Sequence, residues 1–158
     1  MIQRIQSVFL LLVAGLLLAS LFLPFWTKNN PNIDEKAHLT AWNLSRTTEN
    51  KPISTESTIY IGLLAIAAGG LAIFEIFQYK KRRFQTVLGA VNSFVIAGVI
   101  GSVLYVSTQK GEILFSPSVM GSYAIGYYLA WGAFVFNILS NRFIRRDELL
   151  VRSSDRLR

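Results

Sequence analysis

The decisive segment reads Tyr79-Lys80-Lys81-Arg82-Arg83-Phe84, four consecutive cations between two apolar runs that are each long enough to cross a bilayer. A Lys or Arg at the centre of a bilayer costs about 2.5–3.5 kcal/mol, so the chain must leave the hydrocarbon here and turn back at once. Basic turns also favour the cytoplasmic side of a membrane. We therefore expect a cytoplasmic turn at residues 80–83, which orients the segments on either side.

The composition is that of a membrane protein. Of 158 residues, 52% are hydrophobic and only 16% are charged, whereas soluble domains carry about 25% charged residues. The net charge of +7 points to anionic lipid rather than nucleic acid, because most cations lie beside apolar segments. The chain has no cysteine, which excludes disulfides, iron–sulfur clusters and thiol chemistry.

Four apolar segments predict a single integral membrane domain with spans at about residues 5–26, 58–77, 84–106 and 118–139. The first would be about 33 Å long as a helix, which matches a hydrocarbon core of about 30 Å. No small-residue cleavage site follows it, because Pro24-Phe25-Trp26-Thr27 stands there, so we expect an uncleaved span rather than a signal peptide.

The distribution of cations predicts the orientation. If both termini are cytoplasmic, eleven of the 16 Lys and Arg residues lie inside, including those of the tail at residues 140–158. The other five lie in the outer loops at residues 27–57 and 107–117. This asymmetry satisfies the positive-inside rule and predicts a multi-pass protein of the cell inner membrane. We expect Lys80, Lys81, Arg82, Arg83, Arg145 and Arg146 to set the topology and to contact lipid headgroups.

The long outer loop shows the alternation of a β-strand. Thr40, Trp42 and Leu44 would share one side of a strand, and a turn-rich stretch separates them from Ile53. A strand over residues 40–44 could pair near Ile53 and be joined by residues 113–115, with Trp42 as the anchor of a small β cap. An irregular loop explains the same composition, and the sequence does not decide between the two.

Small residues recur every fourth position in two of the apolar segments. Such rows predict faces for close helix packing. They are Gly89, Ser93, Ala97 and Gly101 in the third segment, and Ser122, Gly126 and Ala130 in the fourth.

Glu75 is the only acidic residue inside any predicted span. Intramembrane acids are functional by default, so Glu75 and Asn92 could form a proton or cation site. Alternatively, Glu75 is an interfacial carboxylate paired with the basic turn or hydrogen-bonded to a neighbouring helix, an interpretation that its shallow position favours.

The inventory of catalytic groups is poor. His38 is the only histidine, and no glycine-rich phosphate loop is present. Without a second histidine or a cysteine, we expect no metal site and no cofactor, and we expect that the protein is not an enzyme.

The two ends of the chain, Met1–Val8 and Arg145–Arg158, resemble an uncharacterised family of small bacterial four-span membrane proteins, known only as a domain of unknown function. The resemblance implies a bacterial inner membrane and no activity. More loosely, a long first and a short second outer loop are similar to the claudin layout, without the loop cysteines of claudins.

We thus expect an all-α membrane protein, a four-transmembrane-helix bundle to which the outer loops add a small β cap. The leading functional hypothesis is a non-enzymatic accessory, assembly or scaffold subunit that binds another membrane protein or a second copy of itself. The alternative is a small oligomeric transporter or channel that uses Glu75 as an ion-coupled group. The residues do not identify the partner or solute.

Overall fold

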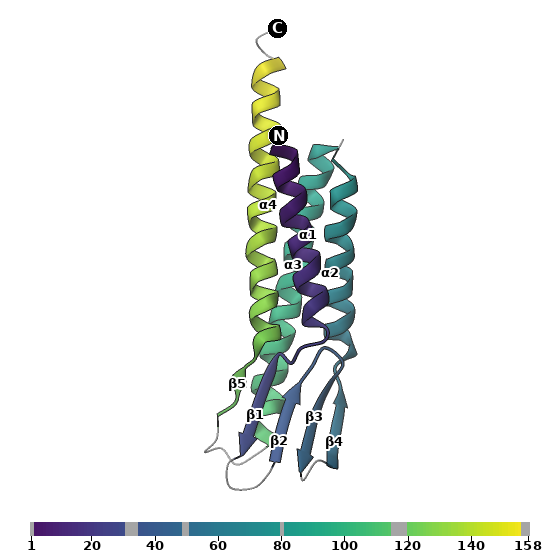
Figure 1. Ribbon diagram of the computed structural model, residues 1–158, viewed down its shortest axis with the longest axis vertical. Helices are drawn as coiled ribbons and strands as arrows, with labels where there is room; N and C mark the ends of the chain where they lie inside the picture. The colour runs from purple at the N-terminus through teal and green to yellow at the C-terminus, as the bar shows by residue number, and fades with distance from the viewer. Residues whose placement is uncertain (1, 31–34, 49–50, 80, 115–119, 156–158) are drawn as a thin grey trace.

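The protein consists of four packed helices and a five-stranded antiparallel sheet (Figure 1). The computed structural model describes residues 2–30, 35–48, 51–79, 81–114 and 120–155. The predicted four-helix packing is confirmed. The all-α class is wrong in one respect, because the outer loops form a complete sheet rather than a small addition to the bundle.

The four helices follow the apolar segments of the sequence. They are α1 (Ile2–Ser20), α2 (Ile59–Phe77), α3 (Arg82–Val106) and α4 (Ile125–Asp155). The α3 helix continues into a π-helical turn, η1 (Ser107–Gly111), and a 3-10 turn, η2 (Glu112–Leu114). The short second outer loop is therefore largely helical. The basic segment separates α2 from α3, as the charge pattern predicts.

Each helix packs against its two neighbours in the ring α1–α2–α3–α4. The start of α1, the junction of α2 with α3 and the far part of α4 lie together at the upper end of Figure 1, which we name the turn end. The sheet lies at the opposite end, which we name the sheet end. The two chain termini are therefore on the same side of the molecule. Phe9 of α1 stacks on Phe136 and Phe143 of α4, with ring centroids 5.8 and 5.5 Å apart.

The sheet has the strand order β4-β3-β2-β1-β5. Its strands are β1 (Trp26–Asn30), β2 (Glu35–Leu39), β3 (Asn43–Thr48), β4 (Lys51–Ser57) and β5 (Ser122–Tyr123). Every pairing is antiparallel, and β1 pairs with both β2 and β5. The two outer loops are thus joined in one sheet, because β5 follows the second loop.

The predicted strand at residues 40–44 is wrong in its position. Residues 40–42 connect β2 to β3, and Thr40 closes this connection through hydrogen bonds with Asn43. The predicted pairing near Ile53 does occur, but its partner is β3 over residues 43–48. Glu112–Leu114 forms η2 and no strand, and Phe115 lies outside the described residues.

Two helix boundaries differ from the predicted spans for the same reason. The α1 helix ends at Ser20, and Trp26 begins β1 instead of ending a span. The α4 helix begins at Ile125, after the strand residues Ser122 and Tyr123. In both places an apolar or aromatic stretch serves the sheet rather than a helix. The tail that begins at residue 140 continues α4 as far as Asp155.

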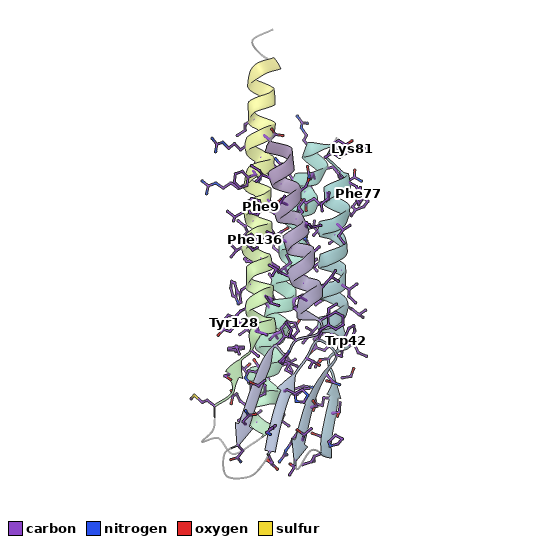
Figure 2. All side chains as sticks on the ribbon, in the orientation of Figure 1. Phe9, Trp42, Phe77, Lys81, Tyr128 and Phe136 are labelled. Carbon is purple, nitrogen blue, oxygen red and sulfur yellow. The ribbon has the colours of Figure 1, made fainter. Side chains whose placement is uncertain are left out.

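Trp26, rather than Trp42, anchors the sheet on the bundle. Trp26 is 1% exposed, whereas Trp42 is 41% exposed and lies against Gly62 at the junction with α2 (Figure 2). Gly111 and Gly121 leave the space for the Trp26 indole, since a Cβ at Gly111 would lie 2.8 Å from the ring and one at Gly121 would overlap it. These two glycines from the second loop therefore determine how closely the sheet approaches α3.

A half-buried ion pair reinforces this junction. The Lys28 side chain has no exposed surface, and its Nζ donates to the Glu112 carbonyl oxygen at 2.8 Å and to Glu112 Oε2 at 3.1 Å. Glu112 Oε1 accepts a hydrogen bond from the Gly121 backbone N–H at 3.0 Å. Lys28 and Glu112 together connect β1, η2 and the segment that leads to β5.

Candidate functional site

The interior of the bundle is polar at the turn end. Fully or nearly buried polar side chains come from all four helices there, namely Gln6, Glu75, Gln85, Asn92, Asn137 and Ser140. Towards the sheet end the interior is lined by apolar side chains, namely Leu17, Leu21, Phe25, Ile61, Ala65, Val99, Val103, Tyr127 and Ala130. The polar group, which we name the polar layer, thus occupies one half of the bundle.

Asn137 is the centre of the hydrogen bonds in the polar layer. Its Nδ2 donates to the Gly89 carbonyl oxygen at 3.0 Å and to Ser93 Oγ at 2.8 Å. Its Oδ1 accepts from Asn92 Nδ2 at 3.4 Å. Ser93 Oγ also donates to the Gly89 carbonyl oxygen at 3.0 Å. Three residues predicted on α3 therefore meet through a residue of α4 that the sequence analysis missed, although an amide inside an apolar segment was a detectable signal.

The predicted row of small residues on α3 divides into two parts. Gly89 is buried and Ser93 is half-buried against α4, whereas Ala97 and Gly101 are exposed. A four-residue step on an α-helix rotates by about 40°, so three steps carry the row about 120° away from its first contact. A Cβ at Gly89 would collide with the Asn141 amide, and one at Gly101 would meet no atom within 4 Å. Only the first half of the row packs within the chain.

Glu75 lies in the polar layer without a hydrogen-bond partner. The side chain is 0% exposed, and neither carboxylate oxygen has a partner among the described residues. Gln85 Nε2 approaches it but donates to the Glu75 backbone oxygen, at 3.2 Å. The predicted pairing with the basic turn is not observed for Lys81 or Arg83, which are both exposed. Lys80 lies outside the described residues.

Other polar atoms of the layer share this lack of partners. Gln6 Nε2, Asn92 Oδ1 and Ser140 Oγ are buried and accept or donate no hydrogen bond within the described part of the chain. A buried polar group without a partner costs about 1–3 kcal/mol, and a charged one costs more. These unpartnered atoms therefore reduce the stability that the polar layer contributes to the bundle.

The described ranges contain no cluster of three or more His, Cys, Asp or Glu side chains that could hold a metal ion. His38 lies on the sheet, where its Nε2 is 2.8 Å from Ser45 Oγ. Within the described part of the chain, the unsatisfied buried oxygens inside the bundle belong to Glu75, Asn92 and Ser140 of the polar layer and to the neighbouring Asn141.

Comparison with known families gives one result. Residues 2–157 match the family described as a domain of unknown function, DUF4293. The chain belongs to this family. No curated protein matches it. The match includes both ends of the chain that carried the resemblance, and the DUF4293 description assigns no activity.

Exposed cations of this DUF4293 chain gather at the turn end. Lys81 and Arg83 lie near the junction of α2 with α3 (Figure 2), and Arg145 and Arg146 lie on α4. The structure describes Arg82 only as the first residue of α3. The residues predicted to contact lipid headgroups therefore lie at the same end as the polar layer.

Proposed function

We propose that the protein is an integral membrane protein whose four helices cross the bilayer and whose sheet lies outside it. The supporting observation is that the bundle exposes large apolar side chains on all four helices, while many of the positions that it buries carry small or polar side chains. Exposed examples are Val8, Leu11, Leu63, Phe74, Val87, Phe94, Tyr128, Val135 and Ile138. Buried positions include Ala14, Ala65, Ala68, Ala72, Ala130 and Ala133. In water this arrangement would expose a large apolar surface that favours aggregation, whereas lipid solvates such a surface.

The length and composition of two helices agree with this proposal. Among the described residues, Ile59–Phe77 and Arg83–Leu114 are long and apolar enough to cross a membrane, and Ile5–Ser20 is a shorter apolar helix. Core helices of soluble proteins are also long and apolar enough to meet this criterion. The exposed apolar faces of the bundle are therefore the stronger support for a membrane location. In the proposed orientation the turn end is cytoplasmic, because the basic turn and the arginines of α4 gather there. The membrane would be a bacterial inner membrane.

Within this membrane frame, the favoured function is that of a non-enzymatic accessory, assembly or scaffold subunit. The observation that carries it is the closed sheet end. Mostly apolar side chains fill the interior there, including Phe25 and the strand residue Trp26. The buried hydroxyls near this end, those of Ser20, Thr58 and Ser107, each donate to a backbone carbonyl oxygen. A bundle that is closed at one end and carries a broad sheet suits a structural role better than conduction.

The exposed half of the α3 row indicates how a partner could bind. Ala97 and Gly101 present a small, open surface in the middle of an otherwise bulky apolar face. Small residues allow a second helix to approach closely, and such contacts drive association in membranes. The partner would be another membrane protein or a second copy of this chain.

Photo-crosslinking in native membranes tests this function. A photoreactive residue at Gly101 should give one discrete crosslinked product, because a partner helix would lie within reach. The matched control is Tyr128, which is 62% exposed on α4 and should give only lipid adducts. Equal, diffuse crosslinking at both positions would argue against a bound partner.

A second candidate function is ion-coupled transport through Glu75. It is favoured by the buried carboxylate, whose two oxygens have no hydrogen-bond partner among the residues that the structure describes. Transport of a solute by the purified protein in liposomes, abolished by Glu75→Gln, would establish it. A protein that forms its normal complexes with Glu75→Gln would be a scaffold instead.

A further inference from the structure

A groove opens between α3 and α4 at the turn end. Its volume is about 360 Å³, and its lining includes Ser93, Phe94, Ile138, Asn141, Arg142 and Arg145. The groove lies on the outer surface of the bundle, next to the polar layer. It combines an apolar part with a strongly basic part, so it has two chemically distinct ends.

Gly89 shapes the inner wall of the groove. The Asn141 amide occupies the space that a side chain at position 89 would fill. Asn141 therefore sits against the α3 backbone and lines the inner wall of the groove, and the space outside it stays open. Phe143, which lies between the two arginines in sequence, turns the other way and stacks on Phe9 of α1.

The basic part consists of Arg142 and Arg145. Residues three apart on a helix share a face, so both guanidinium groups border the groove. Both side chains are exposed, and neither forms an ion pair with a described residue. A guanidinium donates bidentate hydrogen bonds to phosphate oxygens with matching geometry. Two of them side by side form a site for a phosphate group.

The apolar part consists of Phe94 and Ile138, which are 81% and 47% exposed. Both lie further from the turn end than the arginines, because α3 and α4 run antiparallel and residue numbers rise away from that end on α3 and towards it on α4. An occupant that satisfies both parts carries a phosphate at one end and a hydrocarbon chain directed into the bilayer at the other.

We propose that this groove binds one anionic phospholipid, with its phosphate on Arg142 and Arg145 and an acyl chain along Phe94 and Ile138. The proposal rests on the membrane location proposed above, which places the arginines at headgroup level. Basic pockets between membrane helices on the cytoplasmic side are suited to anionic headgroups. A soluble phosphate compound would use the arginines but leave the apolar part of the groove empty.

The test uses the full-length protein, purified in a neutral detergent and depleted of lipid. Dioleoyl phosphatidylglycerol and dioleoyl phosphatidylcholine are titrated separately, and bound lipid is counted by native mass spectrometry. We expect one phosphatidylglycerol to bind at least about tenfold more tightly than phosphatidylcholine. The double variant Arg142→Gln with Arg145→Gln should lose about tenfold or more of this affinity, because each charge-assisted contact is strong.

Three comparisons make the test specific. Arg146→Gln removes a neighbouring exposed charge that does not line the groove and should keep the affinity. The double variant Arg142→Lys with Arg145→Lys keeps the charge but not the bidentate geometry. It should therefore retain only part of the affinity for phosphatidylglycerol. Gly89→Ala should also weaken binding, because it displaces Asn141 towards the groove.

Several outcomes would overturn the proposal. An equal loss in Arg146→Gln, or full recovery with lysines, would show attraction by net charge without a defined site. Competition by glycerol phosphate as effective as that by the lipid would assign the site to a soluble phosphate compound. A protein that still requires detergent but binds phosphatidylglycerol no more tightly than phosphatidylcholine would refute the groove proposal and leave the membrane location intact. A protein that stays soluble and monomeric without detergent would refute the membrane location itself.

Discussion

Two residues of the polar layer differ in how completely their polar atoms are satisfied. Asn137 uses its amide nitrogen and oxygen in three hydrogen bonds, with Gly89, Ser93 and Asn92. Neither carboxylate oxygen of Glu75 forms a hydrogen bond with a described residue. The net value of a hydrogen bond is about 0.5–1.5 kcal/mol, but a buried acceptor without a partner costs about 1–3 kcal/mol. Asn137 therefore joins α3 to α4, whereas Glu75 weakens the bundle.

Replacement of Glu75 by an apolar residue of similar volume should stabilise the protein. We expect Glu75→Met to raise the free energy of unfolding by about 1–3 kcal/mol, the cost of a buried polar group without a partner. Thermal unfolding in detergent measures this change. Glu75→Gln is the matched control, because it keeps two unpartnered polar atoms and should gain less. A loss of stability in Glu75→Met would show that the carboxylate has a stabilising partner.

At the scale of elements, the sheet depends on contacts between segments far apart in the chain. The β1 strand pairs with β5 about 95 residues later, with Trp26 opposite Tyr123 and Thr27 opposite Ser122. The same strand carries Trp26 and Lys28, both fully buried against the second loop. The attachment of the sheet to the bundle is therefore concentrated in β1.

Trp26→Ala should detach the sheet more than Trp42→Ala does. Truncation of a buried tryptophan to alanine lowers the free energy of unfolding by about 3–5 kcal/mol. Truncation of Trp42, which is 41% exposed, should lower it by less than half as much. Hydrogen exchange of the amides in β1 and β2 measures the effect, since each 1.4 kcal/mol of lost stability gives about tenfold faster exchange. Faster exchange in Trp42→Ala than in Trp26→Ala would contradict the role of Trp26 as anchor.

The sequence predicted the elements that local signals define. The four cations at residues 80–83 locate the ends of α2 and α3 to within two residues. The β1 strand was missed because Thr27, Lys28 and Asn29 are polar, and only their pairing with β2 makes them a strand. The end of α1 and the start of α4 were misplaced because Trp26 and Tyr123 are aromatic residues that continue the apolar segments in the sequence. In the structure both belong to the sheet. Glu75 and Asn92 were recognised as one candidate site, and Gly89 and Ser93 as part of one row, but Asn137, which joins three of these residues, was not recognised.

At the scale of the whole molecule, the proposed orientation places the two ends of the bundle on opposite sides of the membrane. Because the chain contains no cysteine, single cysteines can report the side of each segment without background. Ser54→Cys lies on the exposed β4 strand, whereas Lys81→Cys and Leu149→Cys lie at exposed positions of the turn end.

A membrane-impermeant maleimide should label Ser54→Cys in intact spheroplasts. It should label Lys81→Cys and Leu149→Cys only after the membrane is permeabilised. Detergent-solubilised protein, in which all three positions should react, is the control for accessibility. Labelling of Leu149→Cys in intact spheroplasts would reverse the orientation.

The junction of β5 with α4 has a mechanical consequence. Ala124 alone separates the strand from the helix, and its N–H donates to the Phe25 carbonyl oxygen at 2.9 Å, while the Gly126 N–H donates to the Pro24 carbonyl oxygen at 2.9 Å. The helix then runs without a break for 31 residues, about 46 Å, to Asp155. The edge strand β5 is thus continuous with one long rigid helix, which extends past the other three helices (Figure 1). A torque applied to β5 by a bound molecule would turn the far end of α4, because no hinge interrupts the helix between the two.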